Sequence, residues 1–311
     1  MKKTFALLLA LAMALSLAAC GGSSSGSSTG GSAAPAETTT PAETTPAETT
    51  TPAEPEAAAI TTINPGKLTV ATSPDFAPYE FYAIGADGKP QLAGFEMALA
   101  QYIADYLGLE LDVVPMDFDG TLMELQTKNV DLGMAGYSPK PEREKIMDFS
   151  EIFYTGGQSF ATIKGRESEF PTLESTNDAK YTFGAQTGSI QVDLCQENSP
   201  EAELVQLPKV TDIIQDLLAG NLDGAYLETD VALQYAKNYP DLAVILEVPY
   251  DAAGSVVGVY KGNAALLQGV NEAIEKCLAD GTMADFVAQA GELASGETYE
   301  GLLDENGQVA Q

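Results

Sequence analysis

Few side chains in this sequence are able to hold a charged small molecule, and the first of them is an arginine. Arg143 is one of only 15 lysine and arginine residues and lies just past the end of a predicted strand, close to Ser138. A planar guanidinium can bind a carboxylate through two parallel hydrogen bonds. On composition alone, however, a surface ion pair with Glu142 or Glu144 is the more common arrangement for such an arginine.

Two further polar positions also follow predicted strands. Gly188 and Ser189 open a predicted helix, where unpaired backbone N–H groups and a hydroxyl are a suitable place for an anionic group. Glu228 follows the predicted strand 222–226 and is able to pair with a ligand ammonium group. Each position has a purely local alternative, because Ser189 can be a plain N-cap and Glu228 an N-cap or first-turn acid of the next helix.

Aromatic residues occupy the same kind of position. Phe76, Tyr79 and Phe118 lie in loops that follow predicted strands, where their faces can enclose the body of a ligand. Any one aromatic side chain is more often packed in the hydrophobic core than in contact with a ligand. The position of all three residues in such loops, and not their residue type, therefore favours a ligand-binding role.

The elements that must position these residues form two successive units of strands and helices. The first unit is predicted as strand 67–72, helix 94–107, strand 110–114, a helix that Asp119 caps, and strand 130–135. The second is predicted as strand 181–185, helix 188–195, strand 203–206, helix 210–218 and strand 222–226. Strands that alternate with helices imply an α/β fold with parallel sheets. Ligands bind beyond the carboxyl ends of such strands, in loops 73–79, 136–143, 186–191 and 227–230.

The charge balance and the missing residue types exclude several classes of function. The chain carries 45 acidic against 15 basic residues, so it would repel a phosphate backbone and no nucleic acid partner is expected. It has no histidine, the commonest general base and metal ligand, and we predict no catalytic residue, metal site or cofactor. Cys195 and Cys277 are expected to be buried or idle thiols, because only a fold that joined two distant helices would pair them.

The amino terminus has the features of a secretory signal. Two lysines precede an apolar run over 5–17 that is too short for a comfortable membrane span. The run ends in Leu-Ala-Ala before Cys20, which resembles the lipobox of bacterial lipoproteins. We therefore expect a signal peptide over 1–19, a diacylated Cys20 and attachment to the outer face of the cell membrane. Residues 20–59, rich in Ser, Thr, Pro and Glu, are predicted to be a disordered tether.

Three longer stretches of the chain carry a more specific signal. They are KLTVATSPDFAPYEF, GFEMALAQYIADYLGLELDVVPMDFDGTLMELQTKNVDLGMAGYSPKPERE and MDFSEIFYTGGQ. In order and spacing they resemble the type II periplasmic and extracellular solute-binding proteins of polar amino acid ABC importers, solute-binding family 3. The resemblance covers nearly all of residues 66–290. It implies a protein that captures an amino acid and delivers it to an ABC permease and its ATPase, acting as a monomer.

The resemblance also implies a two-lobe fold. Each lobe would be a mostly parallel sheet flanked by helices, and two strands would join the lobes as a hinge. One lobe would comprise residues 60–160 together with 257–311, and the other residues 161–256. Closure of the lobes would bury the ligand and complete a site that is divided between them.

Carried over residue by residue, the resemblance implies one site for a zwitterionic amino acid. Arg143 and Ser189 would hold the α-carboxylate, and the backbone around Ala135, Gly136 and Ser138 would assist them. These residues would then form one binding site. This favours the ligand-binding role over the ion pair and helix caps that composition alone favours.

The other half of the implied site binds the rest of the amino acid. Glu228 falls where the family keeps an acid for the α-ammonium group. Phe76 and Phe118 match the aromatic pair that stacks about the ligand side chain. All of these residues come from the loops after predicted strands, as the α/β pattern requires.

The predicted pocket departs from the family's binders of basic amino acids. Those proteins, and some glutamine binders, place an aspartate where this chain has Ser73, so a cationic ligand side chain would lose a partner here. Gln186 lies at a second position that faces the ligand side chain and offers both a donor and an acceptor. A neutral polar amino acid is therefore expected, unless the loop turns Asp75 inward.

Two alternatives belong to other functional classes. A cyclohexadienyl or arogenate-type dehydratase has the same fold, but it needs a placed proton donor, for which only Glu228 or Asp75 would be available. A sensory binding protein would present the same ligand to a receptor instead of a permease, and a permease and ATPase encoded nearby would separate it from a transport protein.

Overall fold

The computed structural model describes residues 59–251, 254–296 and 298–299, all within the compact unit that starts at Pro55. The predicted signal peptide over 1–19, the lipidated Cys20 and the tether up to residue 58 lie outside the described residues. Within the described ranges, none of the helices combines the length and the apolar character needed to cross a bilayer.

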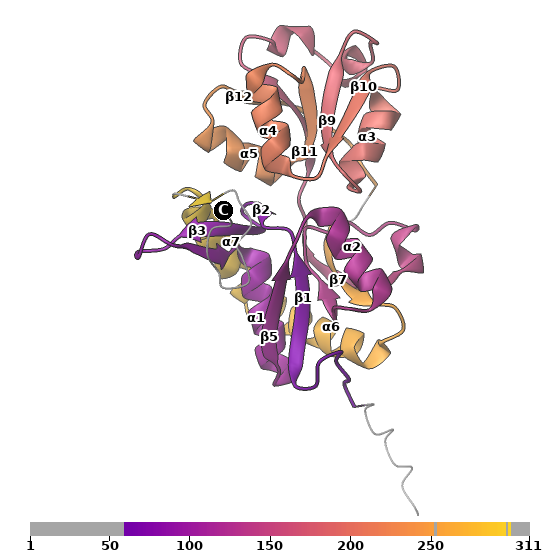
Figure 1. Ribbon diagram of the computed structural model, residues 1–311, viewed down its shortest axis with the longest axis vertical. Helices are drawn as coiled ribbons and strands as arrows, with labels where there is room; N and C mark the ends of the chain where they lie inside the picture. The colour runs from indigo at the N-terminus through magenta and orange to yellow at the C-terminus, as the bar shows by residue number, and fades with distance from the viewer. Residues whose placement is uncertain (1–58, 252–253, 297, 300–311) are drawn as a thin grey trace, which may run out of the picture. The chain divides into compact units, whose positions relative to one another are not determined.

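The first lobe is built on a five-stranded sheet with the strand order β5, β1, β6, β13, β7 (Figure 1). The strands are β5 (Glu110–Pro115), β1 (Lys67–Thr72), β6 (Leu132–Gly133), β13 (Ser255–Tyr260) and β7 (Met147–Tyr154). Only β13 runs against the others, so the sheet is mostly parallel. The helices that pack on or beside it are α1 (Phe95–Leu107), α2 (Phe118–Thr127), α6 (Ala264–Ala279) and α7 (Thr282–Ala294).

The second lobe repeats this plan with the strand order β10, β9, β11, β8, β12. Its strands are β10 (Glu203–Leu207), β9 (Thr182–Gln186), β11 (Gly224–Glu228), β8 (Gln158–Ile163) and β12 (Leu242–Glu247). Here β8 is the reversed strand. The flanking helices are α3 (Ile190–Asn198), α4 (Val210–Ala219) and α5 (Thr229–Asn238), and short 3-10 turns lie at Glu167–Glu169 and Leu173–Thr176. The predicted α/β fold of two mostly parallel sheets is therefore confirmed.

A small antiparallel sheet extends the first lobe beside the loop that follows β1. It contains β2 (Asp75–Phe76), β3 (Glu80–Ile84), β4 (Pro90–Ala93) and β14 (Thr298–Tyr299). The segment 73–79, predicted as a loop, thus contains a two-residue strand that pairs with β3. This pairing restrains the loop that carries Phe76 and Tyr79, both of which are buried.

The chain crosses between the lobes twice. It passes from β7 to β8 through residues 155–157, and the described residues of its return from β12 to β13 are 248–251 and 254. The sequence predicts lobe boundaries slightly later, after residues 160 and 256. Ladder pairing already begins at Gln158, opposite Glu228, and at Ser255, opposite Tyr154. We therefore propose that these two crossings are the lobe boundaries and form the hinge.

Two predictions about the elements of the first lobe are wrong in detail. Asp119 does not cap α2, because the helix begins at Phe118 and the extended Asp117 is its N-cap. The strand predicted over 130–135 is only the two-residue β6, since Gly136 turns the chain with a φ of 61°. The strand over 67–72 is confirmed with the same bounds, and so is the helix that ends at Leu107.

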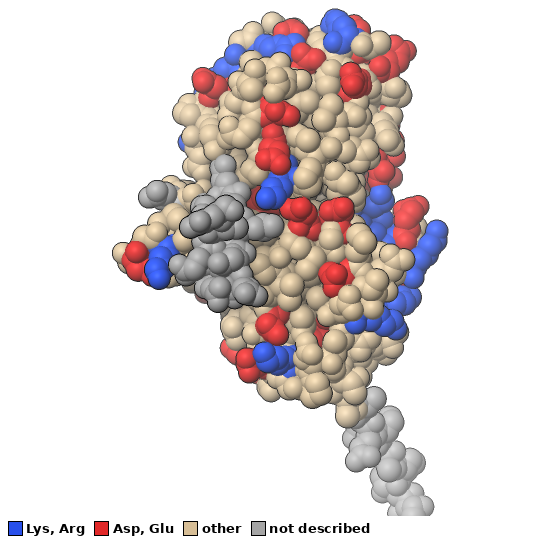
Figure 2. All heavy atoms as spheres, viewed as in Figure 1, with Lys and Arg blue, Asp and Glu red and all other residues tan. Residues whose placement is uncertain are grey.

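Both cysteines of the described region are free and buried, as the sequence predicts. Cys195 packs in the aromatic-rich core of the second lobe, and Cys277 in the main core of the first. At the surface, acidic and basic side chains are scattered over each lobe on the face that Figure 2 shows.

Candidate functional site

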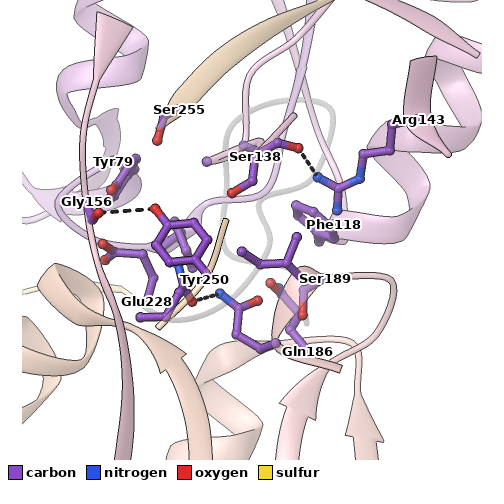
Figure 3. Close-up of a pocket in the computed structure, with 16 residues that line it drawn as sticks. Tyr79, Phe118, Ser138, Arg143, Gly156, Gln186, Ser189, Glu228, Tyr250 and Ser255 are labelled. Atoms are coloured by element: carbon purple, nitrogen blue, oxygen red, sulfur yellow. Dashed lines mark hydrogen bonds between the residues drawn. The ribbon is translucent and has the colours of Figure 1, made fainter. Parts of the chain in front are cut away.

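A cavity lies between the two lobes, at the carboxyl ends of their strands (Figure 3). All of the predicted site residues except Ser73 line it. They are Phe76, Phe118, Ala135, Gly136, Ser138, Arg143, Gln186, Ser189 and Glu228. The structure thus brings together side chains that are far apart in the sequence, and their roles in binding remain predictions.

Arg143 lies in a short 3-10 turn, Arg143–Lys145, and is 6% exposed. Its Nη1 donates to the carbonyl oxygen of Ser138 at 3.0 Å, and its Nη2 donates to that of Gly188 in the other lobe at 3.0 Å. Among the described residues, no carboxylate lies within ion-pair distance of the guanidinium, so the surface ion pair with Glu142 or Glu144 does not form. Burial lowers the pKa of Arg143.

Ser189 is the N-cap residue of α3, but its hydroxyl does not cap the helix. The Oγ atom is buried and has no hydrogen-bond partner in the described part of the chain. Gly188 precedes it with a φ of 77°, a conformation that favours glycine. The turn therefore leaves the Ser189 hydroxyl and the first N–H groups of α3 near the Arg143 guanidinium, as a second source of donors for an anionic group.

Glu228 ends β11 and is also the N-cap residue of α5. Its Oε2 accepts a hydrogen bond from the Val231 N–H at 2.8 Å, while its Oε1 is buried without a partner among the described residues. Both interpretations from the sequence are thus compatible, because one oxygen caps the helix and the other is free for a ligand. Burial raises the pKa of this carboxyl to about 8.

The aromatic residues come from the first lobe. The rings of Phe76 and Tyr79 are 5.1 Å apart, and the ring of Phe118 packs edge-on against Tyr137 at 5.8 Å. Phe76 also lies against the backbone of Gly136, where an added Cβ would be 2.6 Å from the ring. A side chain at position 136 would therefore displace a wall of the cavity.

Ser73 and Asp75 are buried next to the cavity without lining it. The Ser73 hydroxyl donates to Asp75 Oδ1 at 2.9 Å. Asp75 turns toward the second lobe instead of the cavity, and its Oδ2 accepts from the Val210 N–H at 2.6 Å. The loop thus does not turn Asp75 into the pocket.

Several residues that line the cavity are not among those predicted from the sequence. Two of them, Gln158 and Gln191, form a pair in which Gln191 Nε2 donates to Gln158 Oε1 at 2.7 Å. Tyr250 donates its hydroxyl to the Gly156 carbonyl oxygen at 3.1 Å, as Figure 3 shows. Gly156 and Tyr250 lie on the two interlobe crossings, outside the helices and strands. Hydrophobic periodicity therefore gave no signal from which to predict them. Gln191 was detectable, since it lies within the predicted loop 186–191.

Beneath the cavity, two glutamates of the first lobe are completely buried. Glu96 Oε1 accepts from the Gly136 N–H at 2.9 Å, so this carboxyl supports the cavity wall. Glu80 lies nearby, and neither of its oxygens has a hydrogen-bond partner among the described residues. Burial raises the pKa of Glu96 to about 8, and burial together with Glu96 raises that of Glu80 well above its usual range.

Raising the pH from 5 to 8 should therefore lower the free energy of unfolding of the ligand-free protein. In this pH range Glu80 and Glu96 keep their protons in the folded state and release them on unfolding. Each of the two carboxyls therefore lowers the free energy of unfolding by at most about 1.4 kcal/mol per pH unit. The stabilisation is complete below the unfolded pKa and is lost as the pH rises toward the folded one. Urea unfolding at several pH values measures the slope, and the double variant Glu80→Gln/Glu96→Gln should make it shallower. An unchanged slope would exclude this pair as its source.

Known proteins resemble this chain in sequence and structure. The model of the bacterial extracellular solute-binding proteins, family 3, matches residues 68–291. The arginine-binding extracellular protein ArtP of Bacillus subtilis is 32% identical over 215 residues, which cover 68% of this chain and 80% of that protein. A cyclohexadienyl dehydratase of Pseudomonas aeruginosa is 28% identical over 192 residues, covering 61% of this chain and 70% of the enzyme.

Among solved structures, the amino acid ABC transporter substrate-binding protein AbpA of Streptococcus pneumoniae, bound to L-arginine, superposes with a TM-score of 0.71. It is 33% identical, and the alignment covers 75% of this chain and 97% of that protein. The family match extends over both lobes and over the cavity between them. The chain belongs to the bacterial extracellular solute-binding proteins of family 3.

Proposed function

We propose that the protein captures a neutral polar amino acid outside the cytoplasm and delivers it to an ABC importer by closing its two lobes. One observation carries the proposal: within the described part of the chain, a buried arginine without a carboxylate partner shares a cavity with a glutamate that has a free, buried oxygen. Arg143 would bind the α-carboxylate with help from Ser189, and Glu228 would bind the α-ammonium group. A zwitterion would satisfy both charges at once.

The other lining groups support a neutral ligand side chain. Apart from Arg143 and Glu228, the residues that line the cavity are amides, hydroxyls, aromatic rings, glycines and small apolar residues. Asp75 does not line it, and hydrogen bonds from Ser73 and Val210 occupy its oxygens. A guanidinium or ammonium side chain would therefore lack a carboxylate of its own. Since AbpA is bound to arginine and ArtP is named for it, arginine is the main competing ligand.

Contacts between the lobes support a closing motion. Tyr154 of β7 donates its hydroxyl to Asp230 of α5 at 2.8 Å, and Lys140 of the first lobe forms an ion pair with Asp193 of the second. These bonds join side chains that a hinge rotation would separate. In this proposal Cys20 carries the lipid anchor, the protein is a monomer, and the closed form is the one that the permease recognises.

The binding role is favoured over a dehydratase. The dehydratase relative makes an enzyme a specific alternative, but the chain has no histidine, and among the described residues Glu228 is the only acid that lines the cavity. One oxygen of Glu228 already caps α5. Incubation with arogenate or prephenate followed by product analysis tests the alternative, and turnover would overturn the binding role. Co-purification with a permease would separate transport from sensing.

A thermal-shift screen against the twenty amino acids tests the proposed ligand class. A ligand present at about 100 times its Kd stabilises the folded state by roughly 2.7 kcal/mol, which corresponds to a Tm increase of about 5 °C or more for a chain of this size. We expect this increase for neutral polar amino acids and a much smaller one for lysine, arginine, aspartate and glutamate. A largest increase with arginine would contradict the neutral class, and no increase with any amino acid would contradict the proposed function.

A further inference from the structure

Asp75 is a buried acid that bridges the two lobes without lining the cavity. It follows β1 in the first lobe and is 9% exposed. Its Oδ2 accepts from the Val210 N–H at 2.6 Å and from Gln186 Nε2 at 3.3 Å, and both donors belong to the second lobe. Its backbone oxygen also accepts from the hydroxyl of Tyr235 at 3.0 Å. The carboxylate is therefore held by two donors of the second lobe, one of which, Gln186, also lines the cavity.

The partners of Gln186 determine which end of its side-chain amide is available to a ligand. Its Nε2 donates to Asp75 Oδ2 at 3.3 Å and to the carbonyl oxygen of Pro208 at 3.2 Å. An amide nitrogen has two hydrogens, so these two acceptors use both of them. Reversing the amide would place its oxygen against a carboxylate and a carbonyl, which is repulsive. The remaining polar atom, Oε1, can only accept a hydrogen bond.

Gln186 lines the cavity on the side of the second lobe, below Ser189 and across from Phe118 in Figure 3. We propose that Asp75 is a positioning residue that keeps the Gln186 carbonyl oxygen available to the ligand, so that the site selects amino acids whose side chains donate a hydrogen bond. This inference rests on the proposed function and adds a requirement to it. Glutamine, asparagine, serine and threonine meet the requirement, whereas carboxylate, ester and purely apolar side chains do not.

Matched ligands separate hydrogen-bond donation from charge. L-glutamine and the γ-methyl ester of L-glutamate are both neutral, but the ester only accepts hydrogen bonds. The corresponding pair for asparagine is the β-methyl ester of L-aspartate, and for serine it is O-methylserine. The relevant pair is the one that contains the best ligand of the wild-type protein. Isothermal titration calorimetry should show that wild type binds the hydrogen-bond donor of this pair at least about 100-fold more tightly than the matched ester or ether. The ester or ether would leave the buried Gln186 oxygen facing another acceptor.

Two substitutions of Asp75 then test its part in this preference. In Asp75→Asn, the amide oxygen can still accept from Val210 and Gln186, while the amide nitrogen donates to the Ser73 hydroxyl. The preference for the donor ligand should remain within about threefold of wild type. Asp75→Leu removes one of the two acceptors that fix the Gln186 amide and leaves the Val210 N–H available to a reversed amide oxygen, so the preference should fall at least tenfold.

A control separates this effect from a general loss of contact between the lobes. Gln234 Nε2 donates to the Ala294 carbonyl oxygen across the lobes at 2.6 Å and makes no contact with Gln186. Gln234→Met should weaken binding of both members of a pair equally and leave their ratio unchanged. If Asp75→Leu does not fold, Gln186→Met replaces it and should show the same loss of preference.

The outcomes distinguish this inference from the proposed function. If wild type binds no amino acid, the proposed function fails. If wild type binds amino acids but does not prefer the donor, or if Asp75→Leu keeps the wild-type ratio, the positioning role of Asp75 is overturned. A best ligand with a cationic side chain would contradict the neutral ligand class while still meeting the donor requirement.

Discussion

Arg143→Ala should nearly abolish amino acid binding, with a loss of affinity on the order of 100- to 4,000-fold. Removing one partner of a buried, hydrogen-bonded charge pair costs about 3–5 kcal/mol, and each 1.4 kcal/mol is a factor of ten. The ligand-free protein should keep its fold, because the substitution also removes a buried cation that has no carboxylate partner. Calorimetry with the best ligand measures the affinity, and circular dichroism with thermal unfolding checks the fold.

Arg166 offers a matched control for this substitution. It belongs to the second lobe, does not line the cavity, and forms ion pairs with Glu169 and Asp223 at 2.7 Å. Arg166→Ala should therefore leave the affinity near that of wild type while lowering the Tm slightly. Arg143→Lys keeps the charge but not the planar pair of donors, and we expect an intermediate loss. Affinity within tenfold of wild type in Arg143→Ala would remove this arginine from the carboxylate site.

Glu228 should make the affinity depend on pH. The pKa of this carboxyl is raised to about 8 in the ligand-free protein, so at pH 6 it holds a proton that must leave when a ligand ammonium group binds. The affinity for the ligand should therefore increase as the pH rises from 6 to 8, by up to about tenfold per pH unit, and then level off. Titrations in buffers of different ionisation enthalpy should detect the released proton.

Substitution of Glu228 tests the origin of this pH dependence. Glu228→Gln still offers an oxygen to the Val231 N–H, so α5 should remain capped. It removes the charge, and we expect an affinity loss of about 100-fold at pH 8 together with a flat pH profile. Other titratable groups near this carboxyl are Tyr79, Asp230 and Tyr250. A pH dependence that persists in Glu228→Gln would exclude this carboxyl as its source.

The exposed Glu203 at the start of β10 provides the control for charge alone. Glu203→Gln changes the net charge by the same amount as Glu228→Gln but lies outside the cavity. It should alter neither the affinity nor the pH profile, because charges separated by more than a Debye length are largely screened. A similar loss in both variants would indicate a general electrostatic effect.

Local pattern and motif predicted the scaffold and most of the candidate site. The strand Lys67–Thr72 was predictable because burial on both faces favours a continuous apolar, β-rich run. The helix that ends at Leu107 was predictable because burial of one face spaces its apolar residues three and four apart. Residues such as Arg143, Ser189 and Glu228 were selected because each follows a strand in an α/β unit. Parallel strands end at one edge of their sheet, so these positions were expected to meet.

Tertiary structure alone decided how these residues are partnered. Nothing in the local sequence indicates that Asp75 faces Val210 and Gln186, more than 100 residues away, instead of the cavity. Nor does it indicate that Arg143 lacks an acidic partner although glutamates flank it, or that Glu228 uses one oxygen as a cap and leaves the other free. Periodicity reports which side of an element is buried. The choice of partners depends on how the two lobes come together, the first of which combines two segments that are far apart in the chain.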